Sequence, residues 1–522
     1  MGETRRGKLS PKTLIAIVIG AVILIGGSVS AFIFSNLSGK QEYFLAEKNS
    51  IEVLTEKFEE RYEPEMSWLE QTEENPTEST VELSAEYNNP NGSAGYGQMD
   101  PSQFINNSTI TMKNTTDMEN KKLSSELTAD IGGIQIDGLQ FYLTGEKLMV
   151  GLPFIEDLLS VKGNDIGSML HELDPSSFTG EEKVDFASFF EGSLSEEDLD
   201  YFKEAYGEMI YNEIPEDAFK AQEETIKVND QSLDTEKVTM QLSENEVKQI
   251  LTTILDKLEK DEKVKEILSQ QMKLQQLGGT AMNSEMEQMI TDFETGLADA
   301  KEALTDLQIP NGLTSTIWIH DDVIAQRDFQ VQMGPSSEEL VTLAVKGTQL
   351  LKEDSQVFNY DVTFEDSVDQ GKMNLAGDLS WKDNKATDSI NLTIGDIVLS
   401  YNGTETLDDN KREFERTFSI EDPANGGGSL LWNGSSTYNN DQMNAEHDFS
   451  LETATLSQEM ASLHAGVSGK TVDSVKIPEG NSEKDLGNMN AEQLMQYFET
   501  DVTPKFQQWF FGKLSESGNM GF

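Results

Sequence analysis

The sequence predicts an α+β protein: a curled, half-barrel-like antiparallel β-sheet covered by amphipathic helices, behind a single N-terminal transmembrane helix. Residues 314–476 alternate apolar and polar side chains in short segments separated by turn dipeptides, which is typical of antiparallel hairpins. Residues 243–277 and 284–307 each carry one apolar stripe at helical spacing. An uncharged, mostly apolar run extends from Leu14 to Phe34.

The N-terminal run is long enough to cross a hydrocarbon core of about 30 Å. Four basic residues between positions 5 and 12 precede it, and the chain becomes acidic after it. The positive-inside rule therefore predicts a cytoplasmic tail at 1–12, a membrane anchor at 13–37 and an extracytoplasmic remainder. A cleaved signal peptide is the alternative, because Val29-Ser30-Ala31 resembles a cleavage site, but the apolar run continues past it.

Charge and composition exclude several classes of function. The 522 residues include 94 Asp and Glu against 39 Lys and Arg, a net charge of −55, which argues against nucleic acid as a partner. Cysteine is absent, so disulfides, thiolate nucleophiles and thiolate-bound metals are excluded. These features agree with a bacterial, single-pass protein of the cell membrane.

The region 38–310 is expected to combine helices and hairpins. A helix at 41–62 ends before Pro64 and is followed by a polar linker at 63–79. Hairpins are expected at 134–150, with turns at Asp137-Gly138 and Gly145-Glu146. The apolar face of the first helix consists of Phe44, Ile51, Leu54, Phe58 and Tyr62.

The same region continues with a helix that begins at Ser195 and stops before Pro215. Short strands follow at 226–228 and 238–242, and two long helices complete the region. Ser243 with Glu246 forms a capping box at the start of the first long helix, and the single apolar stripe of each helix must pack on the sheet.

The region 311–522 is expected to be an antiparallel meander with a C-terminal helix from Ala491. Gly395-Asp396 and Asn433-Gly434 mark tight turns. One face of the meander is apolar and the other polar, as in a sheet that packs on a core with one side only. The aromatic residues of the last helix, Phe506, Trp509, Phe510 and Phe511, are expected to dock on the core, with a partner-binding surface as the alternative.

In fold pattern, the chain resembles membrane-anchored envelope proteins of Gram-positive bacteria that have half-barrel domains of the lipoprotein-carrier (Lol) type. The residues that carry the resemblance are the helix at 41–62, the hairpins at 134–150, the pair of strands around Trp318 and Phe329, and the meander. The cargo of the Lol-type carriers is a lipoprotein. The Lol-type carriers are shorter and lack this anchor.

No motif points to catalysis. The four histidines are far apart in sequence, and no Gly-x-Ser-x-Gly motif occurs. Acidic pairs such as Glu181/Glu182 and Asp321/Asp322 could act in glycoside hydrolysis, but 94 acidic residues produce such pairs by chance. Loops such as Asp408-Asp409-Asn410 could bind calcium but lack the EF-hand pattern. We therefore expect no catalytic, cofactor or metal residues, and only non-specific screening of the charge by divalent cations.

The sequence thus predicts a non-enzymatic envelope protein, held in the cell membrane by its anchor, that binds an apolar ligand, a lipid or a partner protein. Two alternatives stay open: an envelope hydrolase of the glycosidase type that uses two carboxylates, and a structural or assembly factor without a small ligand. Two carboxylates with raised pKa values in a cleft would favour the hydrolase.

Overall fold

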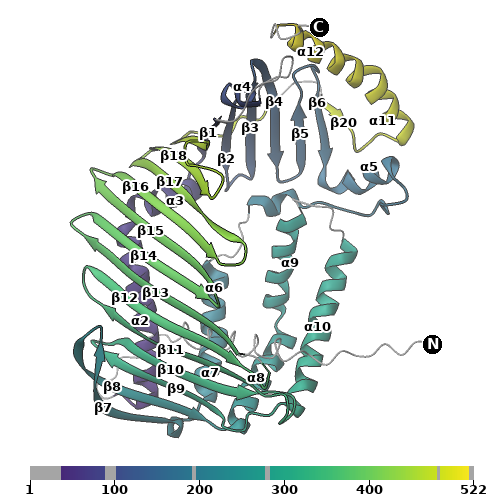
Figure 1. Ribbon diagram of the computed structural model, residues 1–522. Helices are drawn as coiled ribbons and strands as arrows, with labels where there is room; N and C mark the ends of the chain where they lie inside the picture. The colour runs from purple at the N-terminus through teal and green to yellow at the C-terminus, as the bar shows by residue number, and fades with distance from the viewer. Residues whose placement is uncertain are drawn as a thin grey trace.

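The computed structural model describes residues 37–88, 101–190, 196–276, 283–368, 370–478 and 483–516. They form a mixed α+β fold built on one open sheet of 20 strands (Figure 1). The predicted anchor at 14–34 lies outside these residues. Within the described part of the chain, no helix is both long enough and apolar enough to span a membrane.

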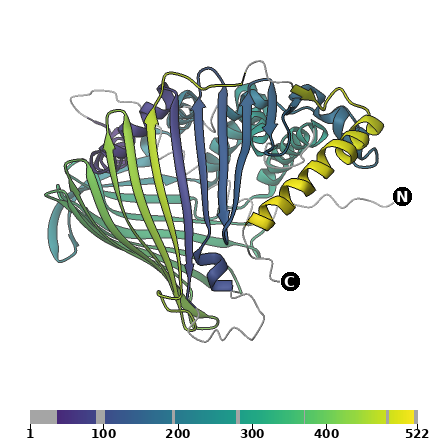
Figure 2. The ribbon, with the colours of Figure 1, turned by 90° about the horizontal axis from the view of Figure 1, so that it is seen from above.

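The sheet begins with the hairpin of β7 (Phe219–Val228) and β8 (Gln231–Leu242), and β8 pairs with β9 (Leu313–His320). A meander then runs without interruption from β9 to β19 (Ala461–Thr471). The early strand β1 (Thr77–Tyr87) pairs with β19, so the sheet continues through β1 to β6. Every pairing of named strands is antiparallel except that of β6 with β20 (Glu483–Asp485). Figure 2 shows the strong curvature of the sheet.

The expected meander at 314–476 is confirmed. Its other strands are β10 Val323–Met333, β11 Val341–Leu351, β12 Ser355–Glu365, β13 Gln370–Lys382, β14 Lys385–Ile394, β15 Ile397–Asp408, β16 Lys411–Asp422, β17 Gly426–Asn439 and β18 Gln442–Thr453. Gly395-Asp396 forms the expected turn. The turn expected at Asn433-Gly434 is wrong, because both residues lie inside β17. A Cβ at Gly434 would lie 2.7 Å from the Phe414 ring, so this glycine makes room for an aromatic neighbour.

The helix expected at 41–62 is α2 (Gly39–Arg61), capped by Ser38. Its first half packs as predicted on the core, but Ile51 and Phe58 are 46% and 56% exposed. The linker expected at 63–79 is wrong. Pro64 stands in the first turn of a second helix, α3 (Glu63–Glu74), because proline is compatible with the start of a helix, and β1 follows directly.

The hairpin of β4 (Ile134–Thr144) and β5 (Lys147–Gly151) turns at Gly145-Glu146 as expected. Asp137-Gly138 is not a turn. It lies within β4, where the register shifts against β3 (Lys122–Ile131) and Gly138 has φ of +79°. A β-bulge and a tight turn both favour glycine at positive φ, so the dipeptide alone could not show which of the two structures forms here. The remaining strands are β2 Thr109–Asp117 and β6 Leu158–Lys162.

The helical segment before Pro215 is present as α6 (Glu196–Phe202) and α7 (Glu208–Glu213), joined by a short π-helical segment (Lys203–Gly207). The single helix expected at 243–277 is two helices, α8 (Glu244–Lys260) and α9 (Glu262–Gln276). Asp261 separates them because its carboxylate accepts hydrogen bonds from the hydroxyl groups of Tyr201 and Tyr206 and from backbone N–H groups of α9. The helix expected at 284–307 is α10 (Asn283–Asp306).

The main core lies at the β7–β12 end of the sheet, under α2, α7, α8 and α10. The stripe of α8 is buried there, as expected. However, the helices do not cover the whole meander. Beyond β12, α2 and α3 cover one end of the strands, and the rest of the same face is apolar and partly exposed. The C-terminal α11 (Ala491–Tyr497) and α12 (Thr503–Glu516) lie near the β4–β6 end, where Phe154 contacts Phe506 and Trp509 (Figure 1).

Candidate functional site

An exposed apolar surface extends over nine adjacent strands, from β13 through β19 to β1 and β2. We call it the open apolar face. Among the described residues it presents ten large side chains that are 36–49% exposed: Ile110, Met112, Leu375, Ile394, Ile397, Leu399, Phe418, Ile420, Leu451 and Leu463. At about 4.8 Å between strands, it spans about 40 Å along the curve of the sheet.

All ten side chains point to the same side as α2. On β16, the side chains of Arg412, Phe414, Arg416, Phe418 and Ile420 share one face because strand residues alternate. Arg412 binds α2 through the carbonyl oxygen of Arg61, which fixes the direction of this face. The cross-strand register carries the face onward, since Ile420 pairs with Leu399.

The opposite face of the same strands is polar. On β16 it carries Lys411, Glu413, Glu415, Thr417 and Ser419, and the neighbouring strands add mostly Ser, Thr, Asn, Asp and Glu. Solvent therefore reaches both faces of this part of the sheet, although only the polar face has the composition that is typical of a solvent-exposed surface. An exposed apolar face of this extent is typical of a binding surface.

At one end of these strands the apolar face is replaced by an ionic cluster beneath the junction of α2 and α3. Its members are Arg61, Glu65, Asp388, Glu405, Arg412 and Arg416. Glu405 is central: Arg61 Nε lies 2.5 Å from its Oε1 and Arg412 Nη1 lies 2.8 Å from the same atom. Arg61 also donates to Asp388, and Arg412 donates to Glu65.

The arginines keep Glu405 ionised. Burial acts to raise the pKa of the Glu405 carboxyl, but the hydrogen bond from Arg61 and the charges of the arginines outweigh it, and the pKa is lowered. Burial also raises the pKa of the nearby Tyr62 hydroxyl. Three arginines and three acids balance in charge, so the cluster attaches α2 and α3 to the sheet without a net charge.

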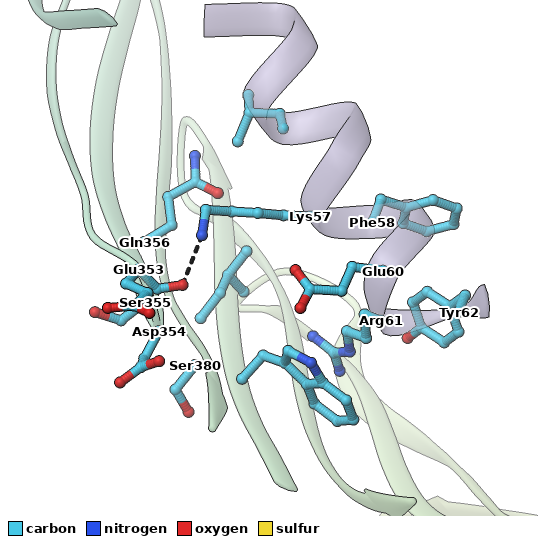
Figure 3. Close-up of a pocket in the computed structure, with 13 residues that line it drawn as sticks. Lys57, Phe58, Glu60, Arg61, Tyr62, Glu353, Asp354, Ser355, Gln356 and Ser380 are labelled. Atoms are coloured by element: carbon cyan, nitrogen blue, oxygen red, sulfur yellow. Dashed lines mark hydrogen bonds between the residues drawn. The ribbon is translucent and has the colours of Figure 1, made fainter. Parts of the chain in front are cut away.

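A cavity of about 210 Å³ lies between α2 and strands β12 and β13, beside the cluster (Figure 3). Leu54, Leu379 and Trp381 give it apolar walls. Lys57 closes one side by donating a 2.6 Å hydrogen bond to the carbonyl oxygen of Glu353. The cavity is smaller than the usual 300–1,000 Å³ of a drug-sized site, so it suits only a small apolar group.

The acidic pairs singled out in the sequence do not converge on a cleft. Glu182 accepts hydrogen bonds from the backbone N–H groups of Thr179 and Gly180, which lower the pKa of its carboxyl to about 2. Asp321 and Asp322 both have positive φ in the turn between β9 and β10.

Among the carboxyl groups of the described residues, one has the raised pKa that acid catalysis requires. Burial and the neighbouring Glu236 raise the pKa of Glu42, on α2, to about 7. Neither residue lines the cavity beside α2, so this pair has no substrate cleft attached to it in the described structure.

The loops considered for calcium are hairpin turns. Asp409 and Asn410 have φ of +45° and +64° between β15 and β16, as expected for a two-residue turn. Within the described ranges, no group of three or more His, Asp or Glu side chains is arranged to hold a metal ion.

The sequence pattern identified which residues share the apolar face, but not that they would stay exposed. The ionic cluster was missed altogether, because Arg61 and Glu405 are 344 positions apart and neither stands in a recognisable motif. One indication of the cluster is present in the sequence. Arg412 and Arg416 lie on a face of β16 whose other side chains are aromatic or aliphatic, so buried partners could be expected for them.

The fold and site define an α+β protein with an open sheet that is polar on one face and apolar on the other. The chain belongs to DUF6583, a protein family of unknown function, whose pattern matches residues 6–281. No curated protein sequence matches the chain significantly.

Several solved structures show a distant likeness. OccK3 (OpdO) of Pseudomonas aeruginosa is 7% identical with a TM-score of 0.24, covering 76% of this chain and 95% of its own. Salmonella typhi OmpF, in complex with daunomycin, is 7% identical with a TM-score of 0.23, covering 77% and 99%. The translocation pore of the P pilus usher PapC is 6% identical with a TM-score of 0.19, covering 70% and 52%. Likeness at this level carries no functional argument.

Proposed function

We propose that this protein is a non-enzymatic lipid-binding protein of the bacterial envelope, and that the acyl chain of the lipid lies on the open apolar face. The observation that carries the proposal is the set of ten exposed apolar side chains, which come from seven of nine adjacent strands and lie on one side of the sheet, with a polar surface on the other side. Burying such side chains against a hydrocarbon chain is favourable by about 25 cal/mol per Å² of apolar surface removed from water.

The predicted anchor supports a lipid as the occupant. We propose that residues 13–37 hold the chain in the cell membrane, with residues 1–12 in the cytoplasm and the sheet outside. The sheet would then stand next to a source of lipids. The resemblance to lipoprotein-carrier half-barrels points in the same direction.

Photolabelling tests this function. Membranes that contain the full-length chain are irradiated with a long-chain fatty acid bearing a mid-chain diazirine, and the labelled peptides are identified by mass spectrometry. We expect labels on peptides from β13–β19 and β2. Labelling restricted to other segments, or none at all, would overturn lipid binding and favour a protein partner for this face.

Adjacent residues of β16 provide a matched pair of variants. Phe418 lies on the open apolar face and Thr417 on the polar face of the same strand. Phe418→Asp should reduce labelling several-fold, whereas Thr417→Asp should leave it unchanged. Phe418 is 40% exposed and its ring contacts Tyr401, so its replacement should lower the melting temperature more than the Thr417 change does, but much less than a substitution in the core would. A large loss of stability with Phe418→Asp would mean that this face belongs to a core.

A further inference from the structure

Arg416 lies where the ionic cluster meets the open apolar face. On the same face of β16, Arg412 lies on one side of it, inside the cluster, and Phe418 and Ile420 lie on the other. Alternate residues of a strand are about 6.6 Å apart, so the guanidinium adjoins the first exposed aromatic side chain. The Arg416 side chain is 15% exposed, compared with 2% for Arg412.

The guanidinium of Arg416 uses little of its capacity to donate hydrogen bonds. Its Nη2 donates to Glu405 at 3.2 Å, and its buried Nε has no hydrogen-bond partner among the described residues. Arg61 and Arg412, in contrast, each donate from all three nitrogens. A buried N–H group without a partner is unfavourable, and no acceptor for Arg416 Nε is present among the described residues.

The surroundings of Arg416 are aromatic rather than acidic. The guanidinium carbon lies 4.2 Å from the centre of the Phe414 ring and 4.7 Å from that of Trp432. Trp432 Nε1 donates to His447 Nδ1 at 3.2 Å, which orients both rings beside the arginine. Glu405 is the acid that pairs with Arg416, and it is shared with two other arginines. Arg416 can therefore accept a second anion.

We infer that Arg416 binds the anionic head group of a lipid whose acyl chain lies over Phe418 and Ile420. This inference rests on the proposed function and names its ligand class: an aliphatic chain that ends in a carboxylate or phosphate. A guanidinium binds such oxygens through paired, charge-assisted hydrogen bonds. Because the Arg416 side chain is still 15% exposed, the head group reaches the guanidinium from the open apolar face, and the chain covers the exposed side chains next to it.

The test compares two probes on the full-length chain in membranes: a diazirine fatty acid and the corresponding fatty alcohol, which has the same chain without the charge. Both are titrated at pH 8.5, and labelling of peptides from β13–β19 is followed. The fatty acid should reach half-maximal labelling at a concentration about tenfold lower than the alcohol. Arg416→Gln should remove this difference by weakening the acid about tenfold and leaving the alcohol unchanged.

Lys411→Gln is the matched control, because Lys411 is on the same strand, faces the opposite side and is exposed. It removes the same charge and should change neither titration. Equal weakening of both probes by Arg416→Gln would show that Arg416 only maintains the fold, and would overturn the inference. Equal binding of the acid and the alcohol to the parent chain would also overturn it, while leaving the proposed function intact. Failure of both probes to label these strands would overturn both.

Discussion

Arg412 and Glu405 form a buried ion pair in which Nη1 lies 2.8 Å from Oε1 and each side chain is 2% exposed. The pair joins neighbouring strands, β15 and β16, and Arg412 also reaches α2 and α3 through the Arg61 carbonyl oxygen and Glu65. A charged group that is buried from water to this extent is stable only while its ion-pair partners remain in place. The cluster therefore fixes where the two helices cross the sheet.

Replacing Glu405 by Gln should destabilise the fold strongly. The change leaves Arg61, Arg412 and Arg416 without their shared carboxylate, and breaking a buried pair costs about 3–5 kcal/mol. The free energy of unfolding, measured by denaturant titration, checks this. Glu413→Gln is the control: Glu413 is exposed on β16 and pairs with Lys411, so its loss should cost under about 1 kcal/mol. Similar costs for the two variants would contradict the assigned role of the cluster.

The stripe of α8 permits a second test of the fold. Ile254 is 6% exposed in the main core, so Ile254→Asp buries an unpaired charge and should destabilise by about 3–5 kcal/mol. Thr252, on the exposed side of the same helix, is the matched position, and Thr252→Asp should cost about 1 kcal/mol or less. If the Ile254 variant melts like the parent, the stripe does not face the core.

Local patterns in the sequence predicted much of this fold. Alternation identified the meander, because a strand that is apolar on one face and polar on the other repeats every two residues. The capping box at Ser243 and Glu246 is confirmed, with Glu246 N–H donating to the serine hydroxyl. Such signals involve residues within a few positions of one another, so they can be read without knowing the tertiary structure.

The features that local patterns did not predict depend on contacts between residues that are far apart in the sequence. Asp261 ends α8 because two tyrosines of the preceding helical segment donate to its carboxylate, and nothing near Asp261 in the sequence shows this. The exposure of Phe418 and Ile420 could not be predicted either. Alternation shows that a face is apolar but not whether a helix covers it. Beyond β12, helices α2 and α3 cover one end of the strands only and leave Phe418 and Ile420 exposed.

The proposed anchor makes a prediction about topology. If residues 13–37 are retained in the membrane, full-length chain should sediment with membranes. External protease on intact cells stripped of their wall should then remove all but a short N-terminal stub. Because the run from Leu14 to Phe34 has basic residues before it, a reversed orientation is not expected. A soluble protein that begins at Phe32 would show a cleaved signal peptide instead.

The Glu42 carboxyl should make stability depend on pH. Burial and Glu236 raise its pKa in the folded protein from an ordinary 4.5 to about 7, so between these values the folded chain holds a proton that the unfolded chain has released. The contribution to stability is therefore complete below about pH 4.5 and is lost as the pH rises through 7. Glu42→Gln removes this loss, since the amide stays neutral.

The melting temperature of Glu42→Gln relative to the parent should thus be higher at pH 8 than at pH 4.5. Taking the difference between the two proteins at each pH cancels the titration of the shared acids that do not interact with Glu42. Glu56→Gln, on an exposed position of α2, gives the matched control and should show a difference that does not change over this range. A Glu42→Gln difference that is equally flat would mean that the carboxyl ionises normally in the folded protein, so that its contact with Glu236 has no energetic consequence.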